Sequence, residues 1–160
     1  KTSKTDTKTP SEDDIQKAIE EDNTIFDLVE TSENLTNTLL IAVSNTESGT
    51  TTTLDVYDLS GQTERSQYNL SSQLPKKDGT NDEYVEAAKN YILNGMMIAS
   101  DMHSYLDKNK LDDLSDYKKR VEAQQNYTLS VVSARMVYLS DAGVPEDKIN
   151  EILGTNSDTE

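Results

Sequence analysis

The chain has 160 residues and a formal net charge of −15, from 15 basic and 30 acidic side chains. Nucleic acids and anionic membrane surfaces select basic proteins, so this charge argues against both as partners. The sequence contains no cysteine, which excludes disulfides, thiolate metal sites and thiol catalysis. The length predicts one domain with a modest core.

The first ten residues, KTSKTDTKTP, are rich in Lys, Thr and Ser. We expect residues 1–10 to be a disordered tether, 11–154 a single helical domain and 155–160 a disordered tail. A polar start without an initial Met fits a mature protein whose signal peptide has been removed. We therefore expect a bacterial extracellular or cell-surface location, compatible with a lipid anchor upstream of Lys1. No apolar run of about 18 residues is present, so we expect no direct membrane insertion.

Helical patterns cover most of the first half of the chain. Residues 11–21, SEDDIQKAIEE, open with a serine followed by acids, which is typical of an N-cap and first turn. From Thr24, apolar residues recur at three- and four-residue steps to about residue 47, before Gly49. A weaker pattern covers residues 51–74, and Pro75 ends it.

Residues 38–59 also match a β-hairpin. The segments LLIAV and TTTLDVY, on either side of a polar turn at residues 47–49, would supply its strands, and threonine favours strands. That alternative gives an α+β fold, with the hairpin packed on two long helices. The similar lengths of four helical segments favour an all-α fold instead: an up-and-down four-helix bundle with a short C-terminal helix.

The most regular helical pattern covers residues 82–106. Apolar, aromatic or glycine residues recur along one face from Tyr84 to Tyr105, which is suited to the interior of a bundle. Thr80 and Glu83 have the spacing of a capping box at its start. Gly95, within this face, permits the close approach of another helix.

A second long helix is predicted for residues 111–141, with Val131, Val132 and Leu139 on its inward face. Gly143 and Val144 follow it in positions that predict a Schellman motif. The proline at 145 can then open a short last helix over residues 145–153.

The short connection at Asn109 makes the two long helices antiparallel neighbours. Folding the chain back there brings Arg135 near Glu83 or Glu86, and aligns polar residues of both helices in one layer. The predicted layer consists of Asn90, Asn94, Gln124, Gln125 and Thr128. Such a layer can fix the register of packed helices, or line a ligand pocket inside the bundle.

The sequence shows no catalytic or metal-binding signature. His103 is the one histidine, and Ser100 stands three residues before it, so the Glu-x-x-His pairs of di-iron bundles are absent. Asp101 points to a different side of the helix from His103. We therefore predict no catalytic residue, metal site or cofactor, and a non-enzymatic module of the cell envelope that binds another protein. The alternative function is a small-ligand sensor or carrier that uses the polar layer.

Overall fold

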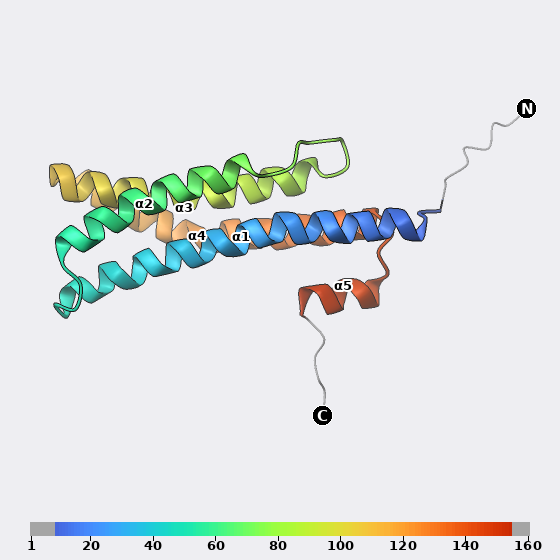
Figure 1. The fold of residues 1–160 in the computed structure, drawn as a ribbon, viewed down its shortest axis with the longest axis horizontal. Coiled ribbons are helices and arrows are strands. Elements are labelled where there is room, and N and C mark those ends of the chain that lie inside the picture. Colours follow the sequence, from blue (N-terminus) through green and yellow to red (C-terminus); the bar gives the residue numbers. More distant parts are fainter. Residues whose placement is uncertain (1–8, 155–160) are drawn as a thin grey trace, which may run out of the picture.

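The computed structural model describes residues 9–154, which form an all-α fold (Figure 1). Its helices are α1 (Glu12–Glu47), α2 (Thr53–Ser72), α3 (Asp82–Lys108), α4 (Leu111–Asp141) and α5 (Glu146–Leu153). The first four run up and down beside one another, and α5 is short. This arrangement confirms the predicted four-helix bundle with a short C-terminal helix.

The predicted tether and tail lie almost wholly outside the described residues. Pro10, the last residue of the predicted tether, is described, and its ring lies against Gly143 after the end of α4. A Cβ added to Gly143 would come within 2.6 Å of Cγ of Pro10. The start of the described chain is thus packed against the turn that follows α4.

Helix α1 is continuous, although the sequence suggested separate patterns before and after Asp22. It starts with a capping box: Oγ of Ser11 accepts from the Asp14 amide at 3.1 Å, and the Asp14 carboxylate accepts from the Ser11 amide at 3.2 Å. The helix continues through Asp22 because this side chain faces inward and binds Tyr84 on α3 and Arg135 on α4.

The alternative hairpin over residues 38–59 is wrong. Residues up to Glu47 belong to α1, and those from Thr53 belong to α2. Thr52 is the N-cap of α2, because its hydroxyl accepts from the Asp55 amide at 3.1 Å while the Asp55 carboxylate accepts from the Thr52 amide at 3.2 Å. The threonines thus supply a loop and a helix cap rather than a strand.

The predicted capping box of Thr80 and Glu83 is also wrong. Asn81 is the N-cap residue of α3 and makes no side-chain bond to the helix. Instead, Oδ1 of Asn81 accepts from the Asp78 amide at 3.0 Å, and its Nδ2 donates to Glu21 on α1 at 2.6 Å. The hydroxyl of Thr80 donates to the Asp78 carboxylate at 2.6 Å. The turn before α3 is therefore organised by Asp78 and Asn81.

The predicted Schellman motif at the end of α4 is confirmed. The Val144 amide donates to the Leu139 carbonyl at 3.0 Å, and the Gly143 amide donates to the Ser140 carbonyl at 3.0 Å. Gly143 has φ of +88°, a conformation that glycine adopts without strain. The motif turns the chain back so that α5 lies beside α4.

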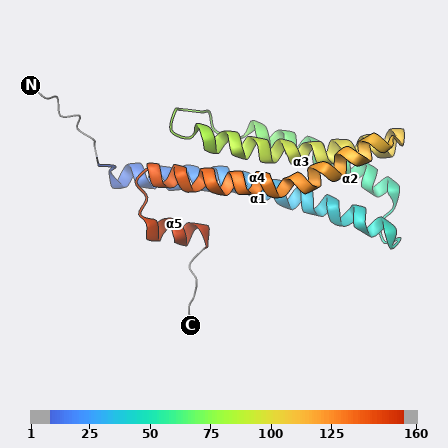
Figure 2. The ribbon, with the colours of Figure 1, turned by 180° about the vertical axis from the view of Figure 1, so that it is seen from behind.

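Helix α3 is the central element of the bundle. It packs against α1, α2 and α4, whereas α2 and α4 do not approach each other closely. At one end, the α1–α2 loop and the α3–α4 turn diverge, as Figures 1 and 2 both show. We call this the open end. The other end, where α1 and α3 begin and α4 finishes, is the closed end.

The core is divided between the two ends. The larger cluster of buried apolar side chains lies toward the closed end and includes Ile25, Ile92 and Leu139. The smaller cluster lies toward the open end and includes Leu39 and Met102. Fewer buried apolar side chains thus hold the open end together than the closed end.

Candidate functional site

A buried ion pair crosses the closed end of the bundle. The fully buried Asp22 accepts from Nε of Arg135 at 2.7 Å, from Nη2 of Arg135 at 3.0 Å and from the hydroxyl of Tyr84 at 2.7 Å. The guanidinium of Arg135 also lies over the ring of Phe26, 3.7 Å from its centroid. A buried charge is tolerated when it is paired and hydrogen-bonded in this way. Arg135 thus pairs with Asp22 and not with Glu83 or Glu86, near which the sequence placed it; Glu83 lines a pocket with Ala134, the neighbour of Arg135.

A second set of hydrogen bonds lies beside this ion pair, where the ring of Tyr138 contacts that of Tyr84. The hydroxyl of Tyr138 donates to Glu21 at 2.9 Å, and Glu21 also accepts from Asn81. Burial, together with the hydrogen bond to Asp22, raises the pKa of the Tyr84 phenol far above its usual range. Burial and the bond to Glu21 raise the pKa of Tyr138 in the same direction. These polar groups hydrogen-bond to one another and so hold α1, α3 and α4 together. None of their enclosed side-chain atoms lacks a hydrogen-bond partner.

A second buried polar contact lies in the middle of the bundle. Nε2 of Gln67 on α2 donates to the Ser32 carbonyl at 3.1 Å and to the Thr36 hydroxyl at 3.0 Å, both on α1. A Cβ on Gly95 of α3 would approach Nε2 of Gln67 to 2.8 Å. The absence of a side chain at Gly95 thus leaves room for the Gln67 amide between the helices. We expected Gly95 to permit a close approach at this position.

The five residues of the predicted polar layer do not form one enclosed layer. Asn94 is buried, and its Nδ2 donates to the Arg120 carbonyl of α4 at 3.0 Å. Gln124 is half-buried and donates to the hydroxyl of Tyr91 at 3.3 Å. These two residues do join α3 to α4 at the expected level. Asn90 is exposed on α3.

The remaining predicted residues, Gln125 and Thr128, are exposed on α4. Together with Gln124 they line a broad groove between α1 and α4, with a volume of about 460 Å³. The other wall carries the carboxylate of Glu33 on α1. The groove is open to solvent, and apart from Tyr91 and Val121 its lining residues are polar. Ligand binding by these residues stays a prediction.

His103 contacts α2 rather than a carboxylate. Its Nδ1 lies 3.1 Å from the Tyr57 carbonyl and 3.2 Å from Oγ of Ser60, and its ring stacks on that of Tyr57 with 4.1 Å between centroids. Asp101 pairs instead with Arg120 at 2.7 Å. Among residues 9–154, no three His, Asp or Glu side chains lie close enough to hold a metal ion. His103 is thus engaged in packing α2 on α3.

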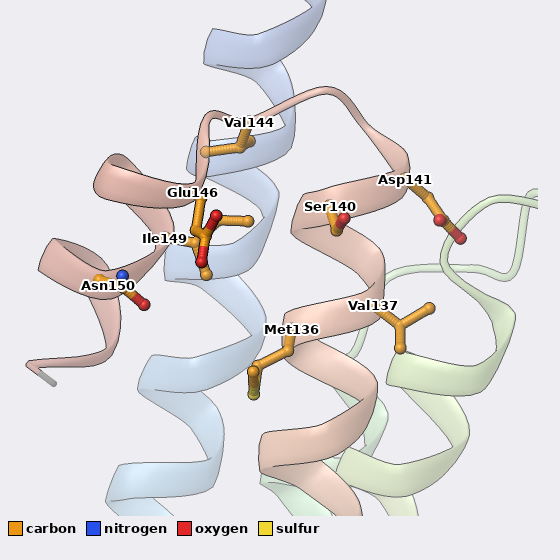
Figure 3. Close-up of a pocket in the computed structure, with 8 residues that line it drawn as sticks. All are labelled: Met136, Val137, Ser140, Asp141, Val144, Glu146, Ile149 and Asn150. Atoms are coloured by element: carbon orange, nitrogen blue, oxygen red, sulfur yellow. The ribbon is translucent and has the colours of Figure 1, made fainter.

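A groove with apolar and polar lining residues in equal number lies between α4 and α5. Its volume is about 420 Å³, and Figure 3 shows its residues on α4, on α5 and on the link between them. Val144 and Ile149 are buried at its base, whereas Met136 and Val137 on α4 are 46% and 47% exposed. We call this the α4–α5 groove. It is lined by Met136, Val137, Ser140, Asp141, Val144, Glu146, Ile149 and Asn150.

An exposed apolar stripe on α4 leads to this groove. Leu129 is 60% exposed, and Val132 and Met136 follow it at three- and four-residue steps with 36% and 46% exposure, so the three lie on one face of the helix. The prediction that Val132 lies on the inward face of this helix is wrong. The exposed stripe could have been found from the sequence of α4, because this helix carries apolar residues on more than its inward face.

Within the described residues, no helix is long and apolar enough to cross a membrane. Comparison with protein-family models, with curated proteins and with solved structures finds no match for this chain. The geometry of these surfaces is therefore the basis for assigning a role.

Proposed function

We propose that this chain is a non-enzymatic module that binds another protein through the α4–α5 groove and the adjoining stripe of Leu129, Val132 and Met136. The observation that carries the proposal is the continuity of this apolar surface. The stripe is exposed on a regular helix and leads into a groove whose base is formed by Val144 and Ile149. Contiguous apolar surface with a polar rim is typical of protein-binding sites.

The charge around this surface defines the chemistry of the partner. Asp141 and Glu146 line the α4–α5 groove. A neighbouring groove shares Val137 and Asp141 with it and adds Asp82 and Glu83. Neither groove is lined by a lysine or arginine. We infer that the occupant is an amphipathic segment with apolar anchors flanked by Lys or Arg, because such a segment matches both the groove and its acidic rim.

The polar interior favours a binding protein over an enzyme. The described candidates for chemistry are already engaged: Asp22 binds Arg135 and Tyr84, and His103 binds the backbone of α2. We also propose that the module acts at a bacterial cell surface, as expected from the sequence. Labelling intact cells of the encoding bacterium with a reagent that does not enter them, followed by detection of the modified protein, tests that location.

The partner can be identified by photo-crosslinking from the proposed surface. A photoreactive phenylalanine at Val132 should crosslink to a protein through a segment that carries apolar residues and flanking Lys or Arg, identified by mass spectrometry. Purified partner should then bind the wild-type protein, with affinity that falls as salt rises. Met136→Asp should weaken this binding about 10- to 100-fold, since a central apolar anchor is replaced by a charge.

The matched control is Leu54→Asp, which makes the same kind of change at an apolar side chain 67% exposed on α2. It should alter affinity less than about twofold, and both variants should keep the melting temperature of the wild type, since the changed side chains are exposed. Equal loss of binding in both variants contradicts the assignment of the surface. A crosslinked segment that is acidic contradicts the proposed chemistry.

A further inference from the structure

The two helical hairpins diverge at the open end of the bundle (Figures 1 and 2). Side chains at this end line a pocket. It has a volume of about 350 Å³, within the range of roughly 300–1,000 Å³ found for small-molecule sites. All four long helices contribute to it, and it lies far along α4 from the α4–α5 groove. Its apolar wall is formed by Val43, Val56, Met102, Leu106 and Leu114.

Tyr117 contributes an unpartnered polar group to this pocket. Its side chain lines the pocket and is only 8% exposed, yet its hydroxyl makes no hydrogen bond within the described part of the chain. Burial alone raises the pKa of this phenol. The enclosed polar side-chain atoms without a partner in the described residues are Oγ of Ser32 and Oε1 of Gln67, not this hydroxyl. Solvent therefore reaches the hydroxyl of Tyr117, which is free to donate to a ligand atom.

Two opposite charges are also unpaired at this pocket. Glu47, the last residue of α1, and Lys118 on α4 both line it and are exposed. Neither forms an ion pair with any side chain between residues 9 and 154, the other one included. The pocket thus combines an apolar wall with one carboxylate and one ammonium group that come from different helices.

We propose that this pocket binds a free α-amino acid with a large apolar side chain. The side chain of the ligand lies against Val56 and Met102, its carboxylate meets Lys118 and accepts from the hydroxyl of Tyr117, and its ammonium meets Glu47. A ligand with only one charge leaves either Glu47 or Lys118 without a counterpart. The site is distinct from the polar layer predicted from the sequence, and it does not depend on the protein-binding surface of α4.

The test compares three probes of similar shape by titration calorimetry: L-phenylalanine, 3-phenylpropanoate, which lacks the ammonium, and phenethylamine, which lacks the carboxylate. L-phenylalanine should bind with a Kd on the order of 1 mM or tighter, as expected for a ligand of this size, and more tightly than either analogue. Glycine, without an apolar side chain, should not bind. In protein with ¹³C-labelled methionine methyl groups, L-phenylalanine should shift the signal of Met102 and leave that of Met136, in the α4–α5 groove, unchanged.

Two variants assign the charged groups. Lys118→Met should weaken L-phenylalanine and 3-phenylpropanoate about three- to fivefold, the effect of one exposed ion pair, and leave phenethylamine unchanged. Glu47→Gln should weaken L-phenylalanine and phenethylamine by a similar factor and leave 3-phenylpropanoate unchanged. The matched controls, Lys119→Met and Glu30→Gln, change exposed charges that do not line the pocket and should leave all three affinities within about 1.5-fold.

Several outcomes would overturn the proposal. No binding of L-phenylalanine or L-leucine up to their solubility excludes an apolar amino acid as the ligand. Phenethylamine or 3-phenylpropanoate binding as tightly as L-phenylalanine excludes recognition of both charges. A shift of Met136 equal to that of Met102 shows unspecific association with apolar surface. The variants change exposed residues, so unaltered circular dichroism spectra should accompany any change in affinity.

Discussion

The two ends of the bundle differ in whether the polar side chains considered above have partners. At the closed end, Asp22, Arg135 and Tyr84 saturate one another inside the core. At the open end, the hydroxyl of Tyr117 makes no hydrogen bond to the described residues, and Lys118 beside it forms no ion pair with them. Polar groups that satisfy one another hold helices together, whereas unsatisfied groups at a pocket have unused capacity for a ligand. We infer from this difference that the ion pair at the closed end serves the fold and that the pocket at the open end is a candidate ligand site.

The largest expected effect comes from breaking the closed end. Arg135→Met leaves the carboxylate of Asp22 buried beside α3 without its counter-charge. Removing one partner of a buried ion pair costs about 3–5 kcal/mol of unfolding free energy, measured by denaturant unfolding near pH 7. Adding Asp22→Asn to this variant should recover part of the loss, because it removes the unpaired charge and keeps a group that can accept the hydrogen bond of Tyr84.

The control for this experiment is an exposed pair. Lys77 and Glu86 lie 2.6 Å apart, with side chains 46% and 49% exposed. Lys77→Met should cost no more than about 1 kcal/mol. Equal costs for Arg135→Met and Lys77→Met would contradict the view that the buried network holds the closed end together.

A smaller effect is expected from pH, because stability should depend on the ionisation of two tyrosines at the closed end. Burial raises the pKa values of Tyr84 and Tyr138 far above their usual range, so an unfolded chain loses these protons from about pH 10 while the folded chain keeps them. The unfolded state then binds fewer protons, and stability falls as pH rises. Above about pH 10, the unfolding free energy should fall by about 1.4 kcal/mol per pH unit for each phenol, or by about 2.8 kcal/mol for both.

Chemical denaturation between pH 9 and 11.5 measures this slope. The double variant Tyr84→Phe/Tyr138→Phe should make the decline shallower by about the contribution of two phenols. Tyr68→Phe changes a tyrosine that is 62% exposed and should leave the slope as it is. A double variant with the slope of the wild type would show that these phenols ionise as readily in the folded chain as in the unfolded one.

Most of the fold was predictable because helix starts and apolar periods are local signals. Ser11 with Asp14 and Gly143 with Val144 act within one turn, and both predictions are confirmed. The predictions of helix bounds were wrong where contacts with residues distant in sequence determine the structure. Asp22 resembled a break in the pattern because its counter-charge, Arg135, lies 113 residues away in sequence.

The candidate site was less predictable because exposure depends on which helices meet. The period of α4 gave no means of distinguishing Val131, which is buried, from Val132, which is exposed. The polar layer was placed correctly only where two adjacent helices face each other, as at Asn94 and Gln124. The pocket at the open end involves all four long helices and their divergence, which no local pattern encodes.

The smallest expected effect on stability is the sharpest test of the contrast between the ends. Tyr117→Phe removes a hydroxyl that makes no hydrogen bond within residues 9–154, so the unfolding free energy should change by less than about 0.5 kcal/mol. Tyr84→Phe takes a donor from the buried Asp22 and should cost about 1–3 kcal/mol. If Tyr117→Phe also weakens L-phenylalanine binding while stability holds, the hydroxyl serves the pocket rather than the fold. If Tyr117→Phe instead lowers the unfolding free energy as much as Tyr84→Phe does, the hydroxyl of Tyr117 contributes to the fold.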